Sequence, residues 1–354
     1  MVKGIASNPH PAVQIQYMEI CVRYGSFFEM NPQYIPRVLE DFVGYLHHEH
    51  LRVRTRSWYL FLRFVKHLRK QLGDVARTVV GAIGDLLVIH AVVPRVSSPD
   101  HEDGITSDED EHSPDRIFTS QLSLFEAVGC ITSIPSIPIA DQVSYAQAVC
   151  EPIWADVHKH LPAAKAGEAA SILQINHDIL ALGTIAHGFS NWAMGSTTSN
   201  SILPPPAQEV STAFGRGAEV VLLALESLNS SVEIRTACRS AFSRLVGVLG
   251  SQVLPQLPRW IDGILSRTSS REEMSMFLRL LEQVIFSFRT EISPILDSLL
   301  SPLLQRIFTS LDKPTTGTDD EIHLMELRRE YLSLLLIILN NELGAVLVSS
   351  GMFA

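Results

Sequence analysis

Cysteine is scarce in this 354-residue sequence, and the four cysteines that occur lie far apart. They form no CxxC pair and no paired Cys/His spacing, so the sequence indicates neither a zinc site nor a disulfide framework. We expect reduced thiols in the core of an intracellular protein, with no bound metal and no cofactor. The cysteines are Cys21, Cys130, Cys150 and Cys238.

Long apolar runs and catalytic motifs are also missing. No apolar stretch approaches the roughly 20 residues of a membrane span, and residues 1–10 lack the features of a signal peptide. There is no P-loop, GxSxG or HExxH motif. His158 and His160 flank Lys159, a spacing that does not place two histidines one helical turn apart beside a carboxylate. We therefore predict no membrane contact, no catalytic residues and no enzyme activity.

Charge is sparse and mostly negative. Charged residues make up 19 % of the chain and the formal net charge is −10, which argues against a surface uniformly adapted to nucleic acid. A local basic surface remains compatible with that sum. Apolar residues make up 46 %, enough for a large core.

Apolar residues recur with helical periodicity along most of the chain. In residues 32–45 they fall at Tyr34, Ile35, Val38, Leu39 and Phe42. Sustained alternation bounded by hairpin turns is absent, so no sheet is predicted. The predicted helices span 32–45, 53–72, 74–89, 116–132, 141–160, 165–192, 207–228, 232–249, 253–266, 271–288, 292–311 and 321–340.

These helices come in pairs separated by short breaks. An early proline in one helix (Pro36, Pro255) and a Val-Arg or Val-x-x-Arg step opening another (Arg54, Arg235) are typical of HEAT repeats. Such helix pairs repeat about every 40–47 residues and bury one face by stacking on the next pair. We predict an all-α fold: one α-solenoid segment of HEAT-type antiparallel helix pairs, a superhelix spanning residues 1–354. No polar capping helix closes residues 349–354, so we expect a portion of something longer.

The strongest functional pattern lies in residues 51–72, which contain seven cations and no acid. At about 100° per residue, five of the cations fall within about 80° of one another, opposite the apolar face. Tyr59 lies beside them, where its ring can stack on an exposed base. Arg54 falls on the apolar side and is expected to bond within the stack. We call the five cations the basic stripe: Arg52, Arg56, Arg63, Lys66 and Lys70.

An all-cationic helix face in an acidic chain favours contact with phosphates, which supply affinity without base specificity. Two alternatives stay open: a solvated helix face, and an intramolecular partner for an acidic loop. Residues 232–249 carry a smaller basic set, in which Arg239 and Arg244 are candidate exposed RNA contacts and Arg235 is expected to be structural.

Three stretches interrupt the helices: an acidic loop at 94–115, expected to be disordered, a Ser/Thr/Pro loop at 195–206 and a short loop at 313–320. The acidic loop is either a solvated insertion or a regulator that competes with RNA. Ser107 precedes three acids and Ser113 precedes a proline, so both are candidate phosphorylation sites. Added phosphate would increase the repulsion of RNA.

Four segments resemble the exportin-T family of the importin-β (karyopherin-β) superfamily. They are HPAVQIQYMEICVRYGSFFE at 10–29, QYIPRVL at 33–39, RVRTRSWYLFLRFVK at 52–66 and EISPILDSLLSPLL at 291–304. The resemblance is most specific in the first 70 or so residues, and it suggests the C-terminal half or another fragment of such a receptor.

The resemblance implies a receptor that carries tRNA from nucleus to cytoplasm with the GTP-bound form of Ran. The implied partners are tRNA and Ran-GTP, with nucleoporins also possible, for a monomer that shuttles between the two compartments. The family's main Ran-binding repeats are N-terminal and are absent here. The alternative is a HEAT scaffold, or another karyopherin-type factor, that binds only proteins. Under the tRNA reading the basic stripe faces the concave surface; under the alternative it lies outside or is paired with acids.

Overall fold

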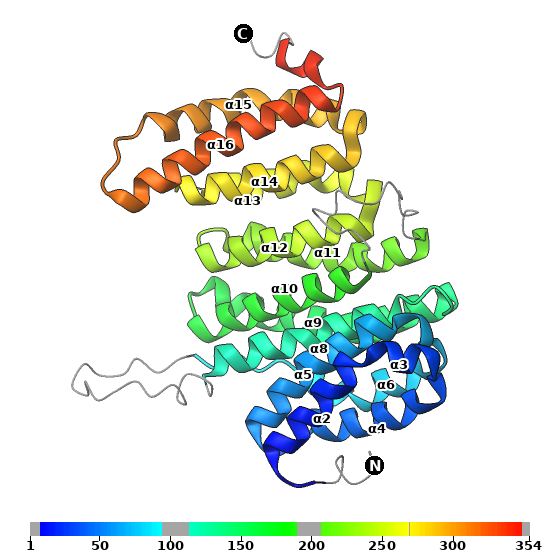
Figure 1. The fold of residues 1–354 in the computed structure, drawn as a ribbon. Coiled ribbons are helices and arrows are strands. Elements are labelled where there is room, and N and C mark those ends of the chain that lie inside the picture. The colour runs from blue at the N-terminus through cyan, green and yellow to red at the C-terminus, as the bar shows by residue number, and fades with distance from the viewer. Residues whose placement is uncertain (1–7, 94–112, 190–206, 269, 349–354) are drawn as a thin grey trace, which may run out of the picture.

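The structure is a computed structural model that describes residues 8–93, 113–189, 207–268 and 270–348. Within these ranges all regular structure is helical and there is no strand, so the predicted all-α solenoid is confirmed. The helices stack side by side along one axis, with the two ends of the chain at opposite ends of the stack (Figure 1).

The helices form two layers. In each layer, helices that belong to successive repeats lie next to one another. The inner layer contains α2 (Pro11–Arg23), α5 (Leu51–Leu68), α8 (Pro114–Thr132), α10 (Ala169–Phe189), α12 (Val232–Leu249), α14 (Arg271–Phe288) and α16 (Thr318–Asn340). The outer layer contains α4 (Ile35–Leu46), α6 (Ala76–Ala82), α9 (Ile139–Lys165), α11 (Gln208–Leu228), α13 (Leu257–Leu265) and α15 (Ser293–Asp312).

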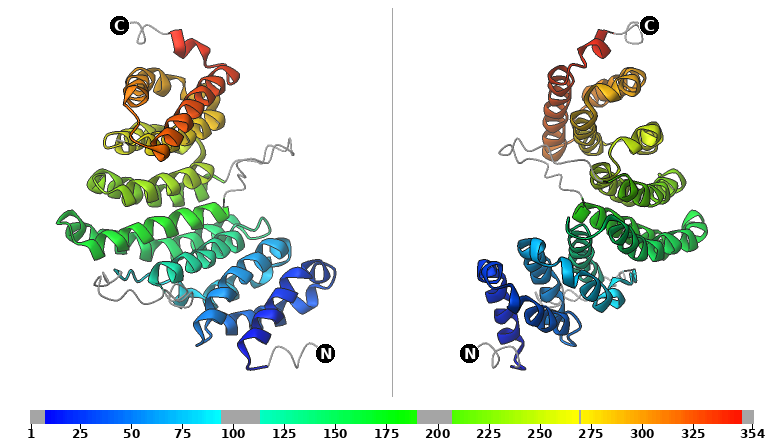
Figure 2. Two further views of the ribbon diagram at one scale, coloured as in Figure 1. Left: turned by 60° about the vertical axis from the view of Figure 1, so that its left-hand side comes forward. Right: turned by 90° about the vertical axis from the view of Figure 1, so that its right-hand side faces the viewer.

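The stack is bowed, and the inner layer lines its concave side (Figure 2, right). The short helix α3 (Gly25–Met30) follows α2, and 3₁₀ turns occupy many of the connections. These turns are Pro32–Tyr34, Arg69–Gln71, Gly73–Val75, Gly84–Leu87, Gly250–Gln256, Arg289–Ile292 and Gly344–Val348.

Local sequence explains where several helices begin. The side chains of Ser113, Ser231 and Ser270 each accept a hydrogen bond from a backbone amide in the first turn of α8, α12 and α14. Such caps satisfy amides that have no partner inside the helix. Ser113 therefore ends the connection, and residues 114–115 belong to α8 rather than to the loop predicted at 94–115. Likewise residues 318–320 open α16 instead of extending the loop at 313–320.

Other helix boundaries also differ from the predictions, and contacts in the structure explain two of them. We expected a helix to end at residue 160, before Pro162, but α9 continues to Lys165. Leu161 and Ala164 are buried there, and their packing outweighs the hydrogen bond that a proline removes. Residues 74–89 form only α6 between two 3₁₀ turns, because Gln121 of α8 donates to the carbonyl oxygens of Leu86 and Val88 and holds that segment off a helical path.

One continuous apolar core runs between the layers along the whole stack. The four cysteines are free and buried within it. Burial raises the pKa of the Cys21 thiol to about 11 and that of Cys150 to about 12, so neither thiol is reactive near neutral pH. The loop predicted at 195–206 and most of the acidic loop, including Ser107, lie outside the described residues.

Candidate nucleic-acid interface

Helix α5 has one apolar face and one basic face, as the sequence predicts. Its buried residues pack into the core, among them Val53, Phe61 and Phe64. All five side chains of the basic stripe are exposed on the opposite face, although Lys70 lies just beyond α5 in the turn Arg69–Gln71. Arg54 is half-buried and donates to the carbonyl oxygen of His48 at 3.3 Å, which confirms that it bonds within the stack.

The stripe lies on the inner layer, between α2 and α8. Arg56 forms an ion pair with Glu19 of α2 at 2.7 Å, and Lys66 forms one with Glu126 of α8 at 2.6 Å. The helices α2, α5 and α8 are consecutive members of the inner layer, and this layer lines the concave side of the stack (Figure 2). The two ion pairs are the pairing with acids that the protein-only alternative predicts.

The other three stripe cations keep their charge available. Among the described residues, no acid pairs with Arg52, Arg63 or Lys70, and all three side chains are exposed. They are therefore free to meet an anion that approaches the concave surface. The stripe thus combines two cations held by carboxylates with three that are not.

Tyr59 joins the stripe through its ring. It is 41 % exposed, and the guanidinium carbons of Arg56 and Arg63 lie 5.3 and 6.0 Å from the ring centroid. Both distances are within cation–π range. The aromatic ring and two guanidinium groups therefore form one cluster at the middle of α5.

A groove of about 760 Å³ opens beside this cluster, between α2, α5 and α8. On the α5 side it is lined by Arg52, Arg56 and Tyr59, and on the α2 side by Gln16 and Glu19. The α8 side contributes Arg116, Thr119, Ser120 and Ser123. No pattern in the sequence points to the α8 residues, because they lie some 60 positions from the stripe and only the stacking of α5 on α8 brings them to it.

The smaller basic set on α12 behaves differently from the expectation. Arg239 is only 9 % exposed, and its Nη2 lies 2.8 Å from Met276 Sδ of α14, so its predicted exposure is wrong. Arg244 is half-buried and donates to Thr184 Oγ1 of α10 at 2.6 Å. Burial lowers the pKa of both guanidinium groups. Stacking of neighbouring inner-layer helices covers side chains that a single helix would expose.

Arg235 is structural, as predicted. Its side chain is 4 % exposed, pairs with Glu273 of α14 at 2.8 Å, and donates to the carbonyl oxygen of Asn229 at 2.6 Å. The guanidinium group thereby fastens α12 to α14 and to the turn before α12.

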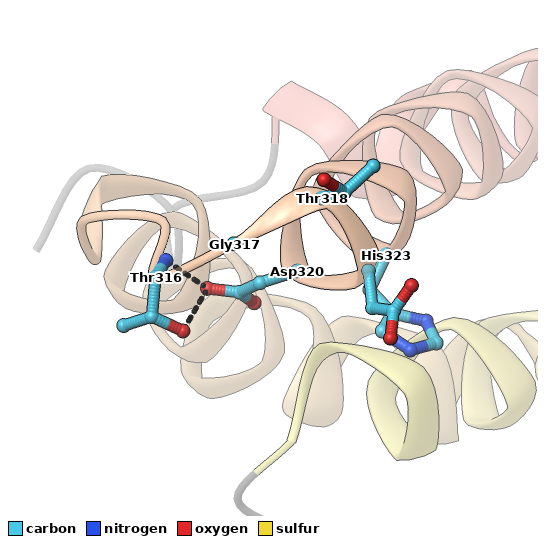
Figure 3. Close-up of a pocket in the computed structure, with 6 residues that line it drawn as sticks. Thr316, Gly317, Thr318, Asp320 and His323 are labelled. Carbon is cyan, nitrogen blue, oxygen red and sulfur yellow. Dashed lines mark hydrogen bonds between the residues drawn. The ribbon is translucent and has the colours of Figure 1, made fainter.

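A second hollow, of about 630 Å³, lies where α15 connects to α16 (Figure 3). Its polar groups bind one another. The amide and hydroxyl of Thr316 donate to Asp320 Oδ2 at 3.0 and 3.5 Å, and Arg271 donates to Asp320 Oδ1 at 2.6 Å. The hydrogen bond from Arg271 holds the pKa of Asp320 below its usual range. This cluster anchors the connection and leaves few groups for a ligand.

Other kinds of site do not emerge in the described part of the chain. There, no three His, Cys, Asp or Glu side chains converge as metal ligands would. None of its helices combines the length and apolarity that crossing a membrane requires. Ser113, a candidate phosphorylation site, is half-buried as the cap of α8, and its hydroxyl accepts from the Arg116 amide at 3.4 Å.

The sequence matches known proteins along almost its whole length. The family model described as Exportin-T matches residues 1–352. Exportin-T of Podospora anserina is 60 % identical over 348 residues, and Exportin-T of Neurospora crassa is 58 % identical over 348 residues. Each alignment covers 98 % of this chain but only 34 % and 33 % of the relative, so the chain spans about a third of their length. With this match and the solenoid fold in agreement, the chain belongs to the Exportin-T family.

Proposed function

We propose that this chain is a tRNA-binding segment of a karyopherin-type nuclear export receptor, and that the basic stripe contacts the RNA backbone. The observation that carries the proposal is the exposure of five cations along one face of an inner-layer helix, three of them without an acidic partner among the described residues. Phosphate contacts of this kind confer affinity that does not depend on base sequence. A carrier of many different tRNAs needs such recognition by charge and shape.

The wider role follows from the family. As part of an export receptor, the segment binds rather than catalyses, and the receptor shuttles between nucleus and cytoplasm with Ran-GTP. We expect the main Ran contacts to lie outside this chain, and contacts with nucleoporins to accompany passage. We also expect the segment to be a monomer. A pull-down with Ran loaded with GTP or GDP, in the presence of tRNA, tests the nucleotide dependence.

A protein-only scaffold is the second candidate, favoured by the ion pairs of Arg56 with Glu19 and of Lys66 with Glu126. If those acids are the natural partners of the stripe, removing its charge leaves RNA binding unaffected. The two functions therefore differ in one measurable property, the dependence of tRNA binding on the stripe.

The test reverses four stripe cations together and measures tRNA binding at low salt. The variant carries Arg56→Glu, Arg63→Glu, Lys66→Glu and Lys70→Glu. A matched control reverses four exposed arginines of the outer layer, with the same change in net charge: Arg37→Glu, Arg77→Glu, Arg216→Glu and Arg259→Glu.

We expect the stripe variant to lose tRNA binding and the control to retain most of it. Both variants have the same net charge, so general repulsion of RNA is the same in both. A difference between them therefore reports the loss of contacts made by the stripe. Circular dichroism checks that both variants keep their helices. Equal tRNA affinity in the stripe variant and the unchanged chain would refute the proposal and favour the scaffold.

A further inference from the structure

We infer that the groove between α2, α5 and α8 binds a single unstacked nucleotide of an RNA strand. The inference rests on the proposed function, since it assigns one subsite of the same surface. It differs from backbone contact along the stripe, because it gives the groove a ligand with a phosphate, a ribose and a base. The groove volume of about 760 Å³ lies within the range of roughly 300–1,000 Å³ typical of small-ligand sites.

Two arginines of the groove, one on α5 and one on α8, are available to an anion. Arg52 of α5 and Arg116 of α8 both line it, both are exposed, and neither side chain has a hydrogen bond or ion pair among the described residues. Their donors are therefore free for a phosphate, and guanidinium groups bind phosphate through charge-assisted hydrogen bonds. Arg56 also lines the groove but is held by Glu19 at 2.7 Å.

Two hydroxyls of α8, near Arg116 in the sequence, offer hydrogen-bond acceptors instead. Thr119 Oγ1 donates its proton to the carbonyl oxygen of Asp115 at 2.7 Å, and Ser120 Oγ donates to that of Arg116 at 2.9 Å. With their protons engaged, the two hydroxyls face the groove as acceptors. A phosphate has no proton to give them at neutral pH, whereas a ribose 2′-hydroxyl or a base amino group does. The groove therefore suits a nucleotide better than a bare anion.

An aromatic surface completes the site. Tyr59 lines the groove and is 41 % exposed, and exposed tyrosine rings and guanidinium planes are the surfaces on which single-stranded bases stack. A base inside an A-form duplex is stacked between its neighbours and cannot enter a groove between helices. A nucleotide from a single-stranded end or loop can enter it, while the duplex parts of a tRNA lie along the stripe.

The experiment compares three fluorescent probes on the full chain at low salt: a five-nucleotide single-stranded RNA, the same sequence as DNA, and a blunt-ended RNA duplex of twelve base pairs. The groove variants are Arg116→Gln and Thr119→Val, both outside the stripe. Lys70→Gln serves as the stripe variant, and Arg328→Gln, an exposed arginine on α16, is the control.

We expect Arg116→Gln to weaken binding of single-stranded RNA about tenfold, as loss of one charge-assisted hydrogen bond does, and to leave the duplex within twofold. Lys70→Gln should weaken both RNA probes alike. The unchanged chain should prefer RNA to DNA, and Thr119→Val should reduce that preference.

Two results would overturn the inference while tRNA binding stays intact: equal effects of Arg116→Gln on single strand and duplex, or equal affinity for the RNA and DNA pentamers. A fourth titration, of the unchanged chain with tRNA under the same conditions, tests the proposed function itself, and absence of tRNA binding there would refute it. The two failures are therefore distinguishable in the same set of titrations.

Discussion

The buried carboxyl of Asp178 should make the stability of this solenoid depend on pH. Asp178 lies on α10, is 1 % exposed, and accepts only a long hydrogen bond of 3.4 Å from Gln174 among the described residues. Burial, together with the nearby charge of Asp156 on α9, raises its pKa to about 8. Near neutral pH the folded chain therefore keeps this carboxyl protonated.

The direction in which stability changes with pH follows from the number of protons bound by the folded and unfolded states. An unfolded aspartate has a pKa of about 3.9, so between pH 4 and pH 8 the folded state binds a proton that the unfolded state does not. The stabilising contribution is complete below the unfolded pKa and is lost as the pH rises toward 8. The slope is about 1.4 kcal/mol per pH unit, or about 3 kcal/mol between pH 5 and pH 7.

Asp178→Asn removes the titration and keeps the volume and one acceptor oxygen. The unfolding entropy is ~2.1 cal/mol/K per residue, and the chain has 354 residues. A change of about 3 kcal/mol in the unfolding free energy therefore shifts Tm by about 4 °C. If the asparagine amide destabilises the folded chain by a constant amount, Tm falls equally at every pH and the dependence of Tm on pH does not change. Thermal melts followed by circular dichroism at half-unit steps from pH 5 to pH 8 measure the difference.

The unchanged chain should lose about 4 °C more than Asp178→Asn between pH 5 and pH 7, and the gap should stop growing above pH 8. Other titrating groups, including the neighbouring His177, are common to both proteins and cancel in the comparison. Parallel curves over the whole range would show that Asp178 is ionised in the folded chain and would refute the reasoning.

Three further predictions concern single contacts. Arg235→Leu should cost about 3 kcal/mol in urea unfolding, because it leaves the carboxylate of Glu273, whose side chain is only 12 % exposed, without its partner, and Glu273→Leu in the same chain should recover part of that loss. Gly188→Ala should lower the unfolding free energy by about 1–3 kcal/mol, since a Cβ there would lie 2.5 Å from a backbone carbonyl carbon of α8. Glu126→Gln should raise tRNA affinity two- to fivefold in low-salt titrations, because it frees Lys66 from an ion pair worth about 0.2–1 kcal/mol; unchanged affinity would mean that Lys66 does not meet RNA.

The sequence predicts most of the long helices, but it does not predict the features that depend on contacts between helices. Helix α5 and its basic face follow from the spacing of its residues alone. Helix α2 has no clear apolar stripe and was not predicted, because it buries residues such as Gln14, Tyr17 and Met18 against more than one neighbour. The broken segment at 74–89 depends on Gln121, a side chain from a different repeat.

The same limit applied to the candidate interface. Periodicity along α5 places the five stripe cations on one face, but it does not show which side chains of neighbouring helices lie beside that face. Arg239 shows the consequence, because a position that is polar by helical period becomes buried once α14 stacks on α12. Arg116 is the converse case, a cation that joins the groove only through the packing of α8 on α5.

The acids beside the stripe also have a consequence for how such a surface works. Glu19 and Glu126 come from the helices on either side of α5, and each neutralises one stripe cation at less than 3 Å. If the stripe contacts RNA as proposed, incoming phosphates must displace these carboxylates or use the remaining cations, and the surface would bind RNA less tightly than its five positive charges alone would allow. A carrier has to release its cargo as well as hold it. A helix face with both paired and unpaired cations therefore suits a receptor that must release RNA better than it suits a protein that holds RNA permanently.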